Sequence, residues 1–270
     1  MNAMSWLMHT SGGYSVLLVL FFSVAAGLVG SFGLMKRMLL AGDVVSHLAL
    51  PGLGLAFLLR INPLIGAATT LFLGTLLIWQ LQKKTGLATE NVIGVVFAAA
   101  LGIGASITPS DDLIEALFGK NQAISLFSFL LGSLAVVFIV AAIWKLRDRL
   151  VLALFSPELA TATGVKVYRV NLYFLLLFSL TILVGLQFMG SLLAGSLIIL
   201  PAAIGRRITN KMSDFLIASS LASAVSVAGG FLLSTFAFPK FGLGPSTVMV
   251  AALLFAICLP IGAKGAAVSA

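Results

Sequence analysis

Asp43 and His47 are the two residues of this chain whose types and spacing are best suited to binding a metal ion. They stand four residues apart in the apolar run 36–59, so on a helix they share one face, about 6 Å apart along the axis. Pro51 has no N–H to donate to the carbonyl of His47, and its ring pushes against that carbonyl, so we expect a kink and a free oxygen. A carboxylate, an imidazole and a carbonyl on one face suit manganese, iron or zinc.

Two interpretations of this pair are open at the level of sequence. Asp43 and His47 can form a buried hydrogen-bonded couple with a purely structural role. Alternatively, they bind a cation that crosses the membrane, because an ionised aspartate near the bilayer centre costs about 2.5–3.5 kcal/mol and needs a partner. One chain supplies only two such side chains, whereas a two-fold dimer supplies four at a shared axis. The cation interpretation therefore predicts a homodimer with its pathway at the subunit interface.

The elements that position this pair are predicted to be transmembrane helices. Of 270 residues, 60% are hydrophobic and only 9% are charged, and the mean hydropathy is +1.17, a balance that excludes a water-soluble domain. The basic residues behind the net charge of +8 fall between apolar segments, which argues against nucleic-acid binding. The single cysteine, Cys258, excludes a disulfide framework and a thiolate metal cage.

The predicted fold class is an all-α polytopic membrane protein with one transmembrane domain over residues 1–270. Apolar runs long enough to be helical spans are 14–35, 42–59, 63–82, 91–108, 122–144, 170–187, 191–205, 215–237 and 246–262. The seventh of these nine is too short to cross the bilayer comfortably, so eight spans plus a short broken or re-entrant helix is the alternative. Glycines such as Gly52, Gly104 and Gly195 indicate close helix packing, or hinges.

Basic residues set the predicted orientation. If nine spans cross the membrane in alternating directions, thirteen basic residues fall on one side of the membrane and three on the other. The N-terminus is therefore expected outside and the C-terminus in the cytoplasm. The thirteen are Lys36, Arg37, Lys83, Lys84, Lys145, Arg147, Arg149, Lys166, Arg169, Arg206, Arg207, Lys211 and Lys264, and the three are Arg60, Lys120 and Lys240. Asp43 then lies on the cytoplasmic side of His47, and an incoming ion is expected to meet His47 first.

Two cytoplasmic loops are distinctive. The loop 145–169 contains a predicted short helix, with Ser156 as its N-cap, Pro157 at its first position and Gly164 at its end. The loop 206–214 is compact and basic, and lies between two apolar runs. The first of these loops is therefore expected to be a surface helix and not a linker.

Catalytic motifs are missing from the sequence. It contains no G-x-x-x-x-G-K-[ST] phosphate loop, no H-E-x-x-H zinc-protease helix and no G-x-S-x-G nucleophile turn. We therefore predict that the chain is not an enzyme and has no resident cofactor, and that any ATP is hydrolysed in a separate subunit.

The run GDVVSHLALPG, residues 42–52, resembles the signature G-D-x-x-S-H-x-x-L-P-G of the membrane permease subunits of ATP-binding-cassette (ABC) importers for zinc, manganese and iron. The likeness extends over residues 14–262 and includes SPELATATGV at 156–165, LIILPAAIGRR at 197–207 and FGLGPSTV at 241–248. Val44 stands where a small residue is common in the family, a departure that leaves the two proposed ligands intact.

The resemblance implies a homodimeric permease in the cytoplasmic membrane of a prokaryote, two copies of a cytoplasmic ATPase, and an extracytoplasmic binding protein that delivers the metal. Asp43 and His47 match the intramembrane acid and histidine of the family, so metal contact is carried over to both. The loop 206–214 is the expected ATPase contact, with 156–166 as a second. The residues expected to dock are Arg206, Arg207, Ile208, Thr209, Asn210, Lys211, Glu158 and Gly164; topology alone also explains the two arginines.

Charged residues of the outer loops are expected to meet the binding protein. Arg60, Lys120 and Lys240 are candidates to pair with its acids, and Asp111, Asp112 and Glu115 with its bases. Ordinary solvated loops are the alternative.

The sequence thus predicts a metal-importer permease that works by alternating access. Metal ligands must be deprotonated, so transport is expected to weaken at acidic pH. The main rival is a proton-coupled secondary transporter that needs no ATPase. A non-transporting membrane scaffold is the second rival, and it leaves the intramembrane Asp43 unexplained.

Overall fold

The computed structural model describes residues 10–38, 41–107, 126–237 and 242–266, and these residues form helices and turns but no strand. The helices are α2 (Thr10–Met35), α3 (Ala41–Ser46), the 3₁₀ turn η1 (His47–Ala49), α4 (Leu50–Leu59), α5 (Pro63–Thr85), α6 (Thr89–Ile107), α8 (Leu126–Phe155), α9 (Pro157–Ala162), α10 (Val167–Met189), α11 (Ser191–Ile208), α12 (Met212–Leu232), the π-helical turn η2 (Leu233–Ala237) and α13 (Leu243–Ala266). The prediction of an all-helical protein is confirmed.

Eight helical segments in the described part of the chain are long and apolar enough to cross a membrane. They correspond to eight of the nine predicted runs, with α3, η1 and α4 counted together as Ala41–Leu59. The helix α11 is not among them; its 18 residues contain Pro201 and end in two arginines. Eight spans plus one shorter helix, the alternative weighed from the sequence, therefore describes this fold.

The helix α8 continues further than predicted. It was expected to end at 144 but runs to Phe155, because the residues KLRDRLVLALF that follow are mostly good helix formers. Most of the predicted loop 145–169 is thus helical, and α9 follows after Ser156. Ser156 occupies the N-cap position but makes no capping hydrogen bond with its side chain. Gly164 lies just beyond α9 with a positive φ of 81°, a conformation that glycine adopts without strain.

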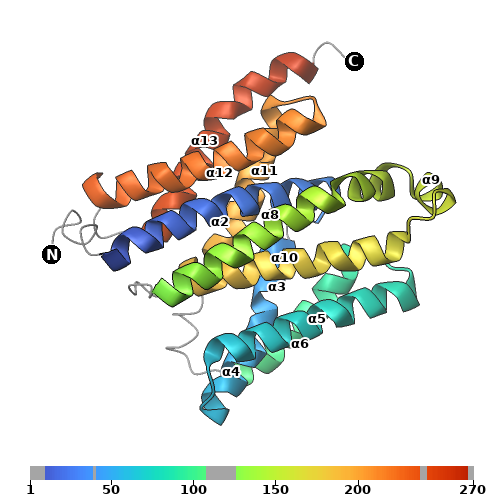
Figure 1. Cartoon of the computed structure of the whole chain (residues 1–270), viewed down its shortest axis with the longest axis horizontal. Coiled ribbons are helices and arrows are strands. Elements are labelled where there is room, and N and C mark those ends of the chain that lie inside the picture. The colour runs from blue at the N-terminus through green and yellow to red at the C-terminus, as the bar shows by residue number, and fades with distance from the viewer. Residues whose placement is uncertain (1–9, 39–40, 108–125, 238–241, 267–270) are drawn as a thin grey trace.

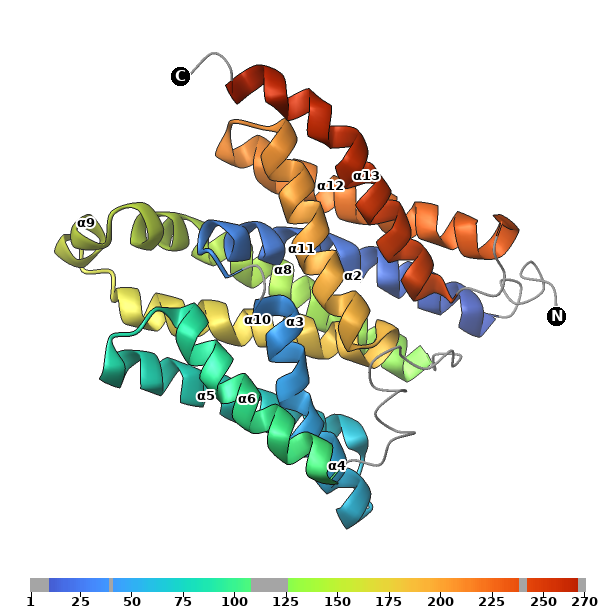
Figure 2. The same ribbon diagram turned by 180° about the vertical axis from the view of Figure 1, so that it is seen from behind.

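The helices form a slanted bundle in which basic residues gather at one end. The helix α5 ends with Lys83 and Lys84, and α11 ends with Arg206 and Arg207. The turns that follow these helices, together with α9, lie toward the right of Figure 1 and toward the left of Figure 2. We call this end the basic end. The first turns of α2 and α8 lie at the opposite end (Figure 1).

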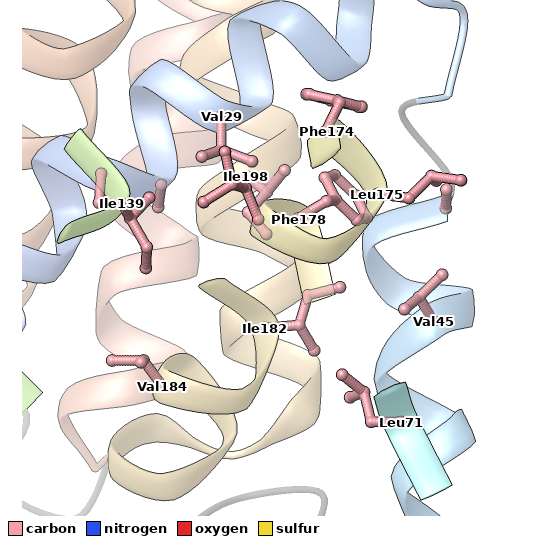
Figure 3. Close-up of a cluster of buried hydrophobic side chains, with 14 of the residues drawn as sticks. Val29, Val45, Leu71, Ile139, Phe174, Leu175, Phe178, Ile182, Val184 and Ile198 are labelled. Atoms are coloured by element: carbon pink, nitrogen blue, oxygen red, sulfur yellow. The ribbon is translucent and has the colours of Figure 1, made fainter. Parts of the chain in front are cut away.

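The helix α10 runs through the middle of the hydrophobic core. Its buried residues Phe174, Phe178 and Ile182 belong to one cluster with residues of α2, α3, α5 and α11, and Figure 3 shows them beside Val45 of α3 and Ile198 of α11. The helix that carries Asp43 is therefore anchored on its Val45 side, while Asp43 itself is exposed.

Candidate metal site

The helix that carries Asp43 and His47 is interrupted at His47. The helix α3 ends at Ser46, and residues His47–Ala49 form the 3₁₀ turn before α4 begins. The N–H of Leu50 donates to the carbonyl of His47. The prediction of a free carbonyl oxygen at His47 was therefore wrong. In the tighter 3₁₀ turn this carbonyl accepts from Leu50, the residue before Pro51, and does not depend on the N–H that Pro51 lacks. The interruption itself lies where the sequence placed it.

Asp43 and His47 face each other without forming a hydrogen bond. His47 Nε2 lies 4.0 Å from Asp43 Oδ1, and the two side chains are 18% and 53% exposed. This separation is beyond hydrogen-bond range, so the two groups do not satisfy each other. A tetrahedral metal with ligand distances of about 2.0–2.2 Å holds two ligand atoms about 3.4 Å apart, so a small side-chain movement brings this pair into range.

The other ring nitrogen of His47 is buried and lacks a hydrogen-bond partner among the described residues. The imidazole lies against Phe97 of α6, with ring centroids 5.6 Å apart. Ligating histidines usually donate their second N–H to an oxygen. The described residues of this chain leave that donor position open, so they do not complete the site.

Glycines bring neighbouring helices against both sides of the interrupted helix. A Cβ at Gly195 of α11 would lie 3.1 Å from Asp43 Cα, and one at Gly104 of α6 would lie 3.1 Å from the nitrogen of Pro51. The hydroxyl of Ser46 donates to the carbonyl of Asp43 at 2.6 Å, and Ser46 is buried. Backbone contact thus fixes the helix, while the Asp43 carboxylate stays open.

No group of three or more His, Cys, Asp and Glu residues that could hold a metal occurs in the described part of the chain. This agrees with the count from sequence, which found two ligands per chain. A metal site with three or more side-chain ligands of these types therefore needs at least one ligand from outside the described residues.

Sequence reasoning missed a second polar cluster, which we call the Lys36 network. Lys36 Nζ donates to Asn171 Oδ1 at 2.6 Å, Asn171 Nδ2 donates to Gln82 Oε1 at 2.8 Å, and Gln82 Nε2 donates to Thr89 Oγ1 at 2.7 Å. The Lys36 ammonium also lies 5.1 Å from the centre of the Phe174 ring. Burial lowers the pKa of Lys36 from 10.5 to about 8. The signal available in the sequence was a pair of amide side chains, Asn171 and Gln82, beside apolar runs.

The predicted docking residues at the basic end are accessible. Glu158 on α9 and Arg206 are exposed, and the guanidinium of Arg207 donates to the carbonyl of Leu259 of α13 at 2.9 Å. The loop after α11 is short, because α12 already begins at Met212.

On the opposite side of the chain, Arg60 is exposed at the end of α4 with a φ of 55°. The remaining residues expected to meet a binding protein lie outside the described residues: Lys120, Lys240, Asp111, Asp112 and Glu115.

A model of the ABC 3 transport family matches residues 13–261. The chain belongs to the ABC 3 transport family. The predicted resemblance to the membrane permease subunits of ABC importers is thereby confirmed. It is a multi-pass permease of an ABC importer, and its place is the cytoplasmic membrane.

Two relatives match this ABC 3 chain over most of their length. The manganese transport system membrane protein MntC of Listeria monocytogenes is 29% identical over 245 residues, which cover 89% of this chain and 87% of the relative. The high-affinity zinc uptake system membrane protein ZnuB of Haemophilus influenzae is 30% identical over 237 residues, which cover 86% and 90%. Relatives with different metals in their names are thus about equally similar to this chain.

A solved structure resembles this ABC 3 permease along almost the whole chain. PsaBC from Streptococcus pneumoniae in complex with Fab superposes with a TM-score of 0.80 at 25% identity, over 94% of this chain and 93% of that chain. The interrupted helix and its neighbours therefore belong to a fold that has a solved counterpart.

Proposed function

We propose that this chain imports a divalent transition-metal ion, manganese, zinc or iron, as the permease subunit of an ATP-driven importer. The observation that carries the proposal is the Asp43–His47 pair, in which an oxygen and a nitrogen face each other 4.0 Å apart and do not satisfy one another. The relatives named for manganese and zinc support this class of ion. Carboxylate and imidazole ligands suit all three metals, so the ligand types do not select among them.

The proposed permease is a homodimer with the metal path between the subunits. Asp43 is 53% exposed in the single chain although it lies in an apolar helix. A lipid-facing carboxylate is unfavourable, whereas a second copy of the same face enclosing a polar path removes the penalty. Two copies supply two carboxylates and two imidazoles, which is enough for a tetrahedral site.

Transport follows alternating access in this proposal. The metal leaves a binding protein outside, meets His47 before Asp43, and is released at the basic end, which faces the cytoplasm. Positive charge on the cytoplasmic side is the usual arrangement in membrane proteins. The close contact of Gly195 with Asp43 makes α11 the element whose movement changes the site most directly.

The proposed ATPase contact combines α9 with the loop after α11. In favour of α9, it packs mainly against α8 and α10 among the described elements, and its Leu159 is 54% exposed. An exposed leucine beside Glu158 on a short helix at the basic end fits a protein contact. Arg206 through Lys211 supply the second part, and Gly164 allows the chain to return to α10.

The outer charged residues are proposed to contact the binding protein. Arg60 fits this role because it is exposed at the end of α4, on the side opposite the basic end. The role extends to Lys120, Lys240, Asp111, Asp112 and Glu115 on the strength of the sequence alone.

Metal uptake by cells that carry the whole importer tests the proposal. Asp43→Asn and His47→Ala should abolish uptake of radiolabelled manganese and zinc, while the variant permeases still assemble with the ATPase. Asp148→Asn is the matched control, because it removes an exposed carboxylate from the end of α8. Normal uptake by either site variant would overturn the assignment.

Two further measurements distinguish this mechanism from the alternatives. A short thiol cross-linker should join two copies of an Asp43→Cys permease if the site lies at a two-fold axis. Purified importer in vesicles should transport only with ATP; uptake without ATP in a proton gradient would indicate a secondary transporter instead.

A further inference from the structure

A groove runs between α2, α8 and α12 at the surface of the bundle, with a cavity volume of about 270 Å³. In Figure 1 these three helices lie in front, whereas in Figure 2, seen from behind, α3 and α11 lie in front. The groove is therefore on the face away from Asp43 and His47. A dimer formed through α3 leaves this face to the membrane.

Most of the groove is apolar. The apolar lining residues include Val24, Leu28, Leu216, Ile217, Leu221 and Ala224, of which Leu221 and Ala224 lie farthest along α12 from the basic end. Between Ser213 and Ala224, both in the lining, α12 rises by about 16 Å, which is close to the roughly 15 Å of hydrocarbon in one leaflet. Ser220 also lines the groove, but its hydroxyl donates to the carbonyl of Leu216 at 3.0 Å and needs no other partner. The groove thus offers a hydrocarbon-lined channel about one leaflet deep.

The end of the groove nearest the basic end carries a cation. The guanidinium of Arg147 lies 5.6 Å from the centre of the Trp144 ring and donates to the hydroxyl of Ser213 at 3.3 Å. Asp43 and His47 are the one acid–base pair within 4.0 Å of each other among the described residues, so Arg147 has no carboxylate partner there. A guanidinium has five N–H donors, and most of those of Arg147 remain available.

The position of Trp144 marks the depth of this cation in the membrane. Its side chain is 65% exposed on α8. The apolar stretch of this helix runs from Leu126 to Trp144, about 27 Å, before the charged residues that begin at Lys145. Exposed tryptophans are enriched at the level of the lipid headgroups. Arg147, one turn further along α8, is therefore at the depth of lipid phosphates.

We propose that this groove binds an anionic phospholipid of the leaflet at the basic end. Its phosphate contacts Arg147 and Ser213, and one acyl chain lies along α2 and α12. Guanidinium groups form strong charge-assisted hydrogen bonds with phosphate. A free phosphate would occupy only the end of the groove at Arg147, and an uncharged hydrocarbon would occupy only its apolar part. Asp214 is exposed on the same turn of α12 but does not line the groove.

Native mass spectrometry of the purified full-length chain tests the proposal. The chain is equilibrated with equal amounts of phosphatidylglycerol and phosphatidylcholine that have identical acyl chains. Phosphatidylglycerol should be retained preferentially, and Arg147→Gln should weaken its retention about tenfold. Lys145→Gln is the matched control, since it removes an exposed charge from the same helix outside the groove. Equal losses in both variants, or no loss in Arg147→Gln, would overturn the proposal.

The apolar half of the groove has its own test. Ala224→Phe fills the channel and should reduce retention of both lipids, whereas Arg147→Lys should keep part of the preference for phosphatidylglycerol. A photo-reactive residue at the exposed position 217 should capture lipid in cell membranes. Capture of a second copy, or of another protein, in place of lipid would contradict the assignment, as would unchanged lipid retention in a folded Ala224→Phe chain.

Discussion

Lys36 and Asp43 stand seven residues apart in sequence, yet their polar surroundings differ in kind. Lys36 donates to Asn171, and the chain of hydrogen bonds continues from there to Gln82 and Thr89, which joins α2, α5, α6 and α10. Asp43 and His47 are out of hydrogen-bond range of each other, and His47 has a buried nitrogen that finds no partner among the described residues.

This difference is the one expected between a structural polar cluster and the metal site proposed for Asp43 and His47. Polar groups that satisfy one another have little left to offer a ligand, and in a low-dielectric interior they fix the helices that carry them. Groups that are held in place but unsatisfied retain their affinity for an incoming ion. The glycine contacts around Asp43 fix the backbone that carries both side chains.

The largest expected effect distinguishes the two clusters by transport. His47→Ala should lower metal uptake by more than about 100-fold, because it removes a direct ligand, and should change the melting temperature little. Asn171→Leu should leave uptake per assembled importer within a few-fold of normal. Uptake assays and thermal melts of the same two preparations check this; a similar loss of uptake in both would erase the distinction.

The next effect concerns stability at the Lys36 network. Asn171→Leu leaves Lys36 and Gln82 without their shared partner, which should cost about 1–3 kcal/mol and lower the melting temperature by several degrees. Asn171→Asp is the informative companion, since a carboxylate restores a partner for the ammonium and should preserve stability. Equal melting temperatures for wild type and Asn171→Leu would mean that the network carries no structural role.

A smaller effect is expected from crowding the metal site. Gly195→Ala introduces a Cβ about 3.1 Å from Asp43 Cα, so α11 must shift slightly, at a cost of about 1 kcal/mol. Gly94→Ala in α6 meets nothing within 4 Å and should be neutral or stabilising. Melting temperatures and uptake of the two variants test whether close contact with α11 holds Asp43; identical behaviour would argue against it.

The smallest expected effect is a pH dependence of stability from Lys36. Its pKa in the folded chain is about 8, below the 10.5 of the exposed side chain. Between these values the unfolded chain binds more protons, so the stability contributed by this group rises with pH across that window and is constant below it. From about pH 7.5 to about pH 8.5 the melting temperature should rise by about 2 °C relative to Lys36→Met. An identical pH profile in the variant would remove Lys36 as the cause.

Much of the helical layout was predictable from composition and periodicity. Apolar runs located the eight long helices, and Gly164 marked the end of the segment that contains α9, because these features depend on the local chain. The length of α8 was underestimated, since charged residues were taken as the end of a span although Lys145 and Arg147 are good helix formers.

The sequence by itself determined the chemistry of the site: an acid and a histidine on one helical face, with Pro51 and glycines beside them. That information is local, because helical spacing sets which residues share a face. The separation of His47 from Asp43 and the hydrogen bond from Leu50 to the carbonyl of His47 are local features of the helix that the sequence pattern did not reveal. Only the tertiary structure decided that α11 touches Asp43 through Gly195. It also brought Lys36 to Asn171 across 135 positions of the chain. Such contacts follow from how whole helices pack, and helix packing is not encoded within any single segment.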